Sequence, residues 1–281
     1  ASGPDGPSEA NIVELSNDAA KKIGYAVDMG QKGMLGQLFG GGSEPPPTKL
    51  AEESIVTIYN GQEIVVRLLA TPIDLEDLAR GHIICEGRGN IESILVDGFT
   101  VRVSGEITPR PTEDLLTAAC GACTSGEIEI PLELIENTLN LEGDIGKMMN
   151  QMKDNQPLFK QTGGIHAASI FDQTGKILLT REDIGRHNAF DKAVGAAMKD
   201  GIEAKIIGLS GRIGWELVAK AVRSGIEIII AVGAISSAAE SLARSTGMTL
   251  VGFATRERPV VIGDLSRIID KPSINRANYV G

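Results

Sequence analysis

Cysteine is scarce in this 281-residue sequence, which contains only Cys85, Cys120 and Cys123. An odd, small number of cysteines argues against the disulfide framework of a secreted protein and favours a reducing compartment. The sequence also lacks an apolar run approaching the roughly 20 residues of a membrane-spanning helix. Its first residues lack the basic and apolar regions of a signal peptide. We therefore expect a cytoplasmic protein that does not act at a membrane.

Positive charge is in deficit as well, because 27 Lys and Arg residues face 37 Asp and Glu residues and leave a net charge of −10. A protein this acidic has no overall attraction for nucleic acid, so any anion site must be a local cluster of basic groups. The sequence has no GxxxxGK[ST] motif and no GxGxxG motif after a predicted strand. It therefore gives no support to ATP hydrolysis or NAD binding.

Larger-scale patterning divides the chain into three predicted parts. Residues 1–48 contain a glycine-rich and a proline-rich stretch, which predicts a flexible arm. Residues 49–126 are expected to form a small α+β domain that ends in a loop with Cys120 and Cys123. In residues 127–281 short apolar strands alternate with helices, which is typical of an α/β domain with a mainly parallel sheet.

Hydrophobic periodicity places the elements within both domains. The turn signals Asn60-Gly61 and Asp97-Gly98 each predict a hairpin in the first domain. The elements expected there are strands at 55–59, 64–69, 91–96 and 99–103 and a helix over 74–84. In the second domain we expect strands at 164–171, 176–180, 205–209, 227–232 and 249–253 and helices over 132–152, 185–198, 214–223 and 237–245.

Cys120 and Cys123 form a Cys-x-x-Cys pair within Thr117–Gly126, a run of small residues with nothing to anchor a core. Such a run predicts a surface loop. The spacing lets the two sulfurs meet, so one thiolate can attack while the other resolves or relays. The pair is compatible with thiol–disulfide exchange, half of a zinc site, or sulfur carriage. The alternative is two buried cysteines that act as small hydrophobes.

Zinc requires about four ligands, and the sequence has no second Cys-x-x-Cys pair. His82 and Cys85 lie three residues apart on a predicted helix and would share one of its faces. For Cys85 alone, a buried structural thiol is the simpler interpretation. The remaining candidate ligands are His166 and His187.

Two later segments hold groups that can bind an anion. His166 follows Gly163-Gly164, where the backbone can approach a ligand closely, although a hydrogen-bonded core histidine is an equal alternative. The stretch Arg181–Lys192 joins a predicted strand to a predicted helix, where free N–H groups favour negative charge. A solvated, salt-bridged helix start is the alternative. The cationic donors in this stretch are Arg181, Arg186, His187 and Lys192, and the balancing acids are Glu182, Asp183 and Asp191.

Ser210-Gly211-Arg212 repeats this arrangement after the next predicted strand, so two neighbouring loops can share one phosphate-bearing ligand. Thr255–Arg258, which follows the last strand of the α/β domain, is a third contributor.

The chain resembles the FdhD/NarQ family of formate dehydrogenase accessory sulfurtransferases over roughly residues 50–265. Several motifs in a fixed order carry the resemblance. They are Ala79-Arg80-Gly81 through Glu86-Gly87, the Cys120–Cys123 pair, Thr162–Ala167, Arg181–Lys192, Ser210-Gly211-Arg212 and Thr249–Ala254.

The resemblance implies a cytidine deaminase-like three-layer α/β domain preceded by a small α+β domain, in a homodimer. It also implies that the protein takes sulfur from a cysteine desulfurase as a persulfide on Cys120. The sulfur then passes to the molybdenum or tungsten bis-molybdopterin guanine dinucleotide cofactor of the formate dehydrogenase catalytic subunit. This cofactor is bound as cargo, and no intrinsic metal is expected. The cofactor-binding residues that we predict are His166, Arg186, His187, Arg212, Phe253, Ala254, Thr255, Arg256, Glu257 and Arg258.

Some positions depart from the family's pattern. Gly214-Trp215 stands where the family has a Ser-rich helix start, and Gly233–Ser236 replaces a Ser-Ala-Pro-Thr run. Thr255 occupies the usual position of an Arg, which here comes one residue later as Arg256. Deaminase chemistry is not expected, because the zinc deaminase signature places His-x-Glu before Pro-Cys-x-x-Cys. Here His166 is followed by two alanines and the Cys-x-x-Cys pair comes earlier.

The function predicted from the sequence is therefore that of a sulfurtransferase, with Cys120 and Cys123 as its catalytic residues. Cys123 would relay the sulfur or release it by forming a disulfide. The principal competing hypothesis is a non-catalytic chaperone that binds the cofactor for formate dehydrogenase maturation. Two weaker hypotheses are a zinc-stabilised protein and a dithiol oxidoreductase.

Overall fold

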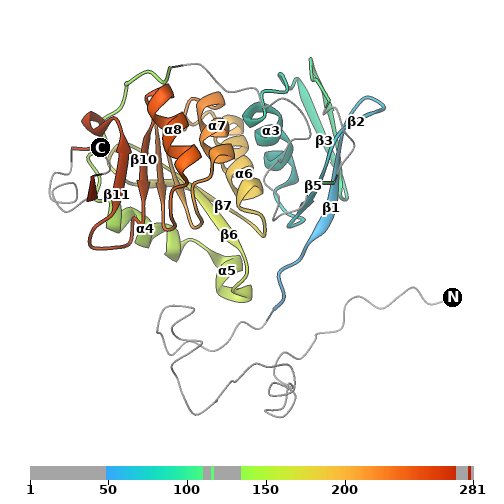
Figure 1. Ribbon diagram of the computed structural model, residues 1–281. Helices are drawn as coiled ribbons and strands as arrows, with labels where there is room; N and C mark the ends of the chain where they lie inside the picture. The colour runs from blue at the N-terminus through green and yellow to red at the C-terminus, as the bar shows by residue number, and fades with distance from the viewer. Residues whose placement is uncertain (1–48, 110–114, 117–133, 270–277, 280–281) are drawn as a thin grey trace, which may run out of the picture. The chain divides into compact units, whose positions relative to one another are not determined.

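The structure, a computed structural model, describes residues 49–109, 115–116, 134–269 and 278–279 (Figure 1). By its contacts the chain divides after Leu50, and every element given below belongs to the unit Ala51–Gly281. That unit has a mixed α/β fold with two mixed sheets, which confirms the predicted α/β class. The three-part division of the chain stays a prediction. Within the described ranges, no helix combines the length and apolar character needed to cross a membrane.

The first sheet has the strand order β3-β4-β1-β2-β5 and is covered on one face by helix α3. Its two hairpins form as the turn signals predicted, with Gly61 and Gly98 at positive φ. Leu75, Leu78 and Ile83 of α3 pack on the inward side chains of β1, β2 and β4. The bounds are β1 Ser54–Asn60, β2 Glu63–Ala70, α3 Leu75–Cys85, β3 Ser93–Asp97, β4 Thr100–Ser104 and β5 Leu115–Leu116.

The second sheet has the order β12-β11-β10-β9-β8-β6-β7. Strands β8, β9 and β10 are parallel, whereas β6 and β7 are antiparallel to their neighbours and β11 is antiparallel to β10. The prediction of a mainly parallel sheet was therefore wrong, because β6 and β7 form a hairpin and β6 then pairs directly with β8. The bounds are β6 His166–Phe171, β7 Ile177–Asp183, β8 Ile206–Leu209, β9 Ile228–Ala231, β10 Thr249–Gly252, β11 Val260–Gly263 and β12 Asn278–Tyr279.

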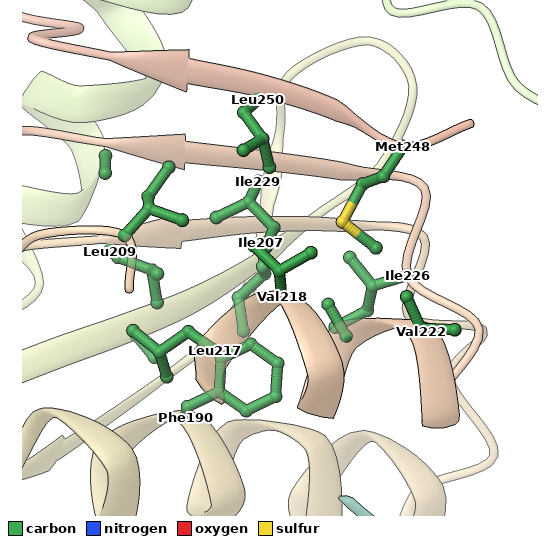
Figure 2. Packing of buried hydrophobic residues seen from close by; sticks show 14 of the residues in the cluster. Phe190, Ile207, Leu209, Leu217, Val218, Val222, Ile226, Ile229, Met248 and Leu250 are labelled. Carbon is green, nitrogen blue, oxygen red and sulfur yellow. The ribbon is translucent and has the colours of Figure 1, made fainter. Parts of the chain in front are cut away.

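Helices cover both faces of the second sheet, so this sheet and its helices form three layers. Side chains of β8 alternate between two cores: Ile207 and Leu209 belong to the core under α6, α7 and α8, and Ile206 belongs to the core with α4. Figure 2 shows the first core, in which Phe190 and Leu217 from the helices meet Ile207 and Leu209. The bounds are α4 Ile145–Asp154, α6 Arg186–Lys199, α7 Trp215–Arg223 and α8 Ser237–Thr246.

The helix predicted over 132–152 was wrong at its start, since α4 begins only at Ile145. The side chain of Asp144 caps α4 by accepting a hydrogen bond from the Lys147 N–H at 2.7 Å. The preceding described residues run without helical structure, and Leu141 bridges to Ile268 instead. Periodicity also missed short elements, namely α5 Pro157–Thr162, η2 Leu265–Arg267 and the strands β5, β11 and β12.

Helices α3 and α6 approach each other so closely that glycine is required on both. A Cβ atom at Gly81 would lie 1.7 Å from the backbone oxygen of Asp191, and one at Gly195 would lie 1.9 Å from that of Asp77. Since no real Cβ atom can occupy such positions, these two glycines allow the backbones to touch. The contact fixes α6, whose first turn lies at the candidate site.

Candidate functional site

The carboxyl ends of the parallel strands β8, β9 and β10 meet at one edge of the second sheet, and three loops start there. These loops contain Ser210-Gly211-Arg212, Gly233 and Phe253–Arg258. Because β6 is antiparallel to β8, its first residue, His166, lies at the same edge. Helix α6 begins beside it, directly after β7. Ligands of open α/β sheets bind at edges of this type.

His166 is held by the Ser210 loop. Its Nδ1 atom lies 3.3 Å from the Ser210 Oγ, which accepts a hydrogen bond from the Ala167 N–H at 2.9 Å. Burial lowers the pKa of His166, and the positive charges of Arg186 and Arg212 lower it further, against an opposing effect of Asp183. The imidazole is therefore neutral at physiological pH.

Arg186 and Arg212, which come from two other segments of the chain, are the cations whose charges act on this histidine. Arg186 is partly exposed in the first turn of α6, and Arg212 is exposed after β8. Within the part of the chain that the structure describes, neither guanidinium has an ion pair or a hydrogen bond to another side chain. Two such cations beside a neutral histidine make this edge electropositive, in a chain whose net charge is negative.

Glycines bring the loops together. A Cβ atom at Gly233 would lie 2.6 Å from the Gly211 carbonyl oxygen, and one at Gly211 would lie 3.4 Å from the His166 ring. The Gly233 carbonyl in turn accepts a hydrogen bond from the Phe253 N–H at 2.9 Å. The three loops therefore form one continuous surface on which a ligand can contact the backbone directly.

The predicted segment Phe253–Arg258 forms the β10 end of this surface. Phe253 adopts a left-handed backbone conformation with φ of 52°, and the Arg256 guanidinium stacks on its ring at 4.0 Å from the centroid. Ala254 is buried, whereas Thr255, Arg256, Glu257 and Arg258 are exposed. A left-handed non-glycine residue is uncommon and costs free energy, which often marks a functional site.

Most other charged side chains of Arg181–Lys192 are used inside the protein. Arg181 pairs with Asp77 of α3 at 2.8 Å, and Lys192 pairs with the fully buried Asp183 at 2.7 Å. Asp183 also accepts hydrogen bonds from the N–H groups of Thr71 and Gly185. The salt-bridged interpretation therefore describes these residues, although Asp183 and Lys192 are buried and Arg181 is only partly exposed.

His187 lies near charged side chains of α6 and α7 and near Glu86, which follows α3. Burial, Lys220 and Arg186 lower the pKa of His187 to about 3, although Asp191 and Glu86 oppose the shift. The side chain is only 7% exposed, and neither ring nitrogen has a hydrogen-bond partner among the described residues. Its role in cofactor binding stays a prediction.

Sequence reasoning missed the polar cluster that joins α3, α6 and α7. Asp191 accepts hydrogen bonds from Lys220 at 2.9 Å and lies 3.1 Å from the His82 Nδ1, and Lys220 also pairs with Glu86 at 2.8 Å. Although burial alone would lower the pKa of Lys220, Asp191 and Glu86 raise it. Burial, followed by Asp191, raises the pKa of the Cys85 thiol, so it is unreactive. In the sequence, the only indication of this cluster was the number of acidic and basic residues within 75–85 and 186–199.

The other residues weighed as metal ligands do not come together. In the described ranges no three His, Cys, Asp or Glu side chains are grouped so as to hold a metal ion. His82 has Asp191 as its partner instead. Cys120 and Cys123, the predicted catalytic pair, lie outside the described residues.

Comparisons with known proteins agree on one family. A sequence model of the FdhD/NarQ family matches residues 51–269. The sulfur carrier protein FdhD of Xanthomonas oryzae pv. oryzae is 33% identical over 238 residues, covering 78% of this chain and 84% of that protein. The protein of the same name from Sulfurisphaera tokodaii is 31% identical over 220 residues, covering 73% and 85%.

A similar fold occurs in a crystal structure described as that of a formate dehydrogenase accessory protein from Desulfotalea psychrophila. The TM-score is 0.65 at 25% sequence identity, and the match covers 78% of this chain and 90% of that one.

Proposed function

The chain belongs to the FdhD/NarQ family, and from this premise we propose that it is a sulfur carrier that serves the maturation of a formate dehydrogenase. In this proposal Cys120 accepts sulfur from a cysteine desulfurase. The protein then passes the sulfur to the molybdenum or tungsten bis-molybdopterin guanine dinucleotide, which it binds as cargo. One observation supports the binding of this cargo. At the sheet edge described above, Arg186 and Arg212 have no side-chain partners in the described ranges and lie beside a neutral His166.

The chemistry of this edge suits a ligand with several phosphates and guanine rings. Guanidinium groups bind phosphate oxygens through paired hydrogen bonds. Gly211 and Gly233 expose backbone that a side chain would otherwise cover. The stacked Phe253 and Arg256 offer flat surfaces of the kind on which a purine can lie. Neutral His166 adds a ring nitrogen that donates or accepts a hydrogen bond without adding charge.

The two cysteines of the pair supply the thiolates and the electrons that the sulfur-transfer steps require. The Cys120 thiolate attacks the terminal sulfur of the desulfurase persulfide, which forms the Cys120 persulfide and releases the desulfurase thiolate. The Cys123 thiolate then attacks the Cys120 sulfur, and the terminal sulfur leaves as hydrosulfide toward the cargo metal. The two cysteine thiols are oxidised to a disulfide and so supply the two electrons. A thiol reductant restores both thiols before the next turnover.

Mass spectrometry of the intact protein tests the first step. After incubation with a cysteine desulfurase and cysteine, the wild-type chain should gain the mass of one sulfur atom, and Cys120→Ala should not. Cys85→Ala is the matched control and should gain sulfur like the wild type, because Cys85 is completely buried. A persistent adduct on Cys120→Ala would refute the assignment of the carrier.

Maturation of formate dehydrogenase separates this proposal from the chaperone hypothesis. With Cys120→Ala the dehydrogenase should remain inactive, while Cys123→Ser should load sulfur but release it poorly. If Cys120→Ala supports full maturation while Arg186→Met and Arg212→Met do not, the protein is a cofactor-binding chaperone instead.

A further inference from the structure

Ser210 is held from two sides by Ala167 of the neighbouring strand β6. Its backbone N–H donates a hydrogen bond to the Ala167 oxygen at 3.0 Å, and its Oγ accepts one from the Ala167 N–H at 2.9 Å. Ala167 is only 2% exposed, so these bonds are shielded from solvent. The hydroxyl oxygen therefore has a fixed position, and only the direction of its proton remains to be set.

The proton of this hydroxyl determines where His166 carries its own proton. Because the Ser210 Oγ accepts from Ala167, its single proton is directed away from that N–H. The acceptor that it meets among the described residues is the His166 Nδ1, 3.3 Å away. The neutral imidazole has one N–H group and one nitrogen that accepts. With Nδ1 as the acceptor, the proton of the ring is on Nε2.

The orientation of the ring is fixed at the same time. A Cβ atom at Gly211 would lie 3.4 Å from both Nδ1 and Cε1 of His166, so this edge of the ring lies against the Gly211 backbone. A ring turned by 180° would bring Cδ2 to the Ser210 Oγ and lose the hydrogen bond. The His166 Nε2 has no hydrogen-bond partner in the described ranges. Unlike both nitrogens of His187, it is not enclosed by the described residues, so a ligand can reach it.

We propose that Ser210 is a positioning residue, which holds His166 as its Nε2–H tautomer so that this N–H donates a hydrogen bond to an anionic oxygen of the ligand. The class of ligand rests on the function proposed above, whereas the tautomer does not. Together with Arg186 and Arg212, the Nε2–H offers donors only, and the outer oxygens of a phosphate group are all acceptors. In the opposite tautomer the Nε2 lone pair would face these oxygens and weaken binding.

The size of the effect follows from the number of states that Ser210 excludes. Without its hydroxyl, the neutral ring can adopt two tautomers in each of two flipped orientations, and one of these states presents the N–H as the wild type does. An apparent dissociation constant rises by the inverse of the competent fraction, so loss of the hydroxyl should weaken anion binding by up to about fourfold. Loss of the N–H itself removes a hydrogen bond to a charged group, which corresponds to about tenfold or more.

Nitrogen-15 NMR of the full chain reads the tautomer, because protonated and unprotonated ring nitrogens resonate far apart. The chain has three histidines, and His166→Gln identifies the signals of His166. In the wild type at pH 8, Nδ1 should be unprotonated and Nε2 protonated. In Ser210→Ala the two nitrogen shifts should move toward each other, whereas Ser210→Thr keeps a hydroxyl and should restore the wild-type shifts. A protonated Nδ1 in the wild type, or His166 signals in Ser210→Ala that match those of the wild type, would overturn the proposal.

Calorimetry with inorganic pyrophosphate tests the role of the N–H. Ser210→Ala should bind it up to about fourfold more weakly than the wild type, and Ser210→Thr should bind it equally well. His166→Gln places an amide N–H near the position of Nε2, whereas His166→Asn places one near that of Nδ1. The asparagine variant should therefore lose about tenfold or more, and the glutamine variant less. The matched control is Ser169→Ala, which removes a β6 hydroxyl bonded to Thr180 and should leave the NMR signals of His166 and the affinity unchanged.

The two measurements separate this inference from the function proposed above. Equal pyrophosphate affinities of His166→Asn and His166→Gln would overturn the donor role of His166 and leave the proposed function intact. A wild type that has the predicted tautomer but binds no pyrophosphate would refute both the donor role and the binding of a phosphate-bearing cargo. Loading of sulfur on Cys120 is independent of either result.

Discussion

Acid should destabilise this protein partly through His187, and replacing that residue with leucine should remove this part of the pH dependence. Leucine is similar in size to histidine and does not titrate. Since neither ring nitrogen of His187 has a hydrogen-bond partner in the described ranges, the substitution breaks no such bond there. The groups that act on the imidazole are Lys220, Arg186, Asp191 and Glu86.

The sign follows from the lowered pKa. The pKa of His187 is about 3 in the folded protein, against 6.5 when unperturbed, so below pH 6.5 the unfolded chain binds a proton that the folded chain does not. The stability from this group is present above pH 6.5 and is lost as the pH falls toward 3. Between the unperturbed pKa and pH 5 lie about 1.5 pH units, and at 1.36 kcal/mol per unit the loss is about 2 kcal/mol.

Urea denaturation measures this loss, with the fluorescence of Trp215, the single tryptophan, as the probe. From pH 7 to pH 5 the free energy of unfolding should fall by about 2 kcal/mol more in the wild type than in His187→Leu. His166→Leu is the control: its pKa is also lowered, but it is less buried, so it should flatten the pH dependence less. Identical pH dependence of the wild type and His187→Leu would show that the pKa of His187 is the same in the folded and unfolded chains, and would refute the reasoning.

Three further predictions concern the contacts around the site. Lys192→Met should lower the free energy of unfolding by about 3–5 kcal/mol, because it leaves Asp183 buried without its cation. The control Lys199→Met should lower it by less than about 1 kcal/mol, since that lysine is partly exposed. Equal losses in urea denaturation would contradict this prediction. Gly81→Ala should abolish folding as seen by circular dichroism, because the added methyl group would overlap the Asp191 backbone. At Gly61 an added Cβ atom has no neighbour within 4 Å, so Gly61→Ala should lower the free energy of unfolding by only about 1 kcal/mol, through backbone strain. Arg186→Met and Arg212→Met should each weaken pyrophosphate binding in calorimetry and leave the midpoint of urea denaturation unchanged. A shifted midpoint with unchanged pyrophosphate binding would show that both arginines have a structural role instead.

The sequence predicted the local elements of this fold well where a strong local signal exists. Asn60-Gly61 and Asp97-Gly98 marked both hairpins, and alternating apolar strands and helices marked the layered second domain. The sequence-based prediction failed where contacts between distant segments of the chain determine the structure. The residues before Ile145 carry a helix-like pattern but bridge to Ile268 instead, and the hairpin of β6 and β7 makes the sheet mixed.

For the candidate site, the sequence by itself predicted which segments bear the candidate ligand-binding groups and in which order, and the same ordered motifs indicated the family. His166, Arg186, Arg212 and Phe253–Arg258 each follow or precede a strand or helix that local patterns reveal. Only the tertiary structure decided which cations remain available for a ligand. Arg181 is paired with Asp77, 104 positions away, and Lys192 is buried against Asp183, whereas Arg186 faces the loops at the sheet edge. A buried charge requires a partner, and that partner is brought to it by packing between distant segments, which no local pattern records.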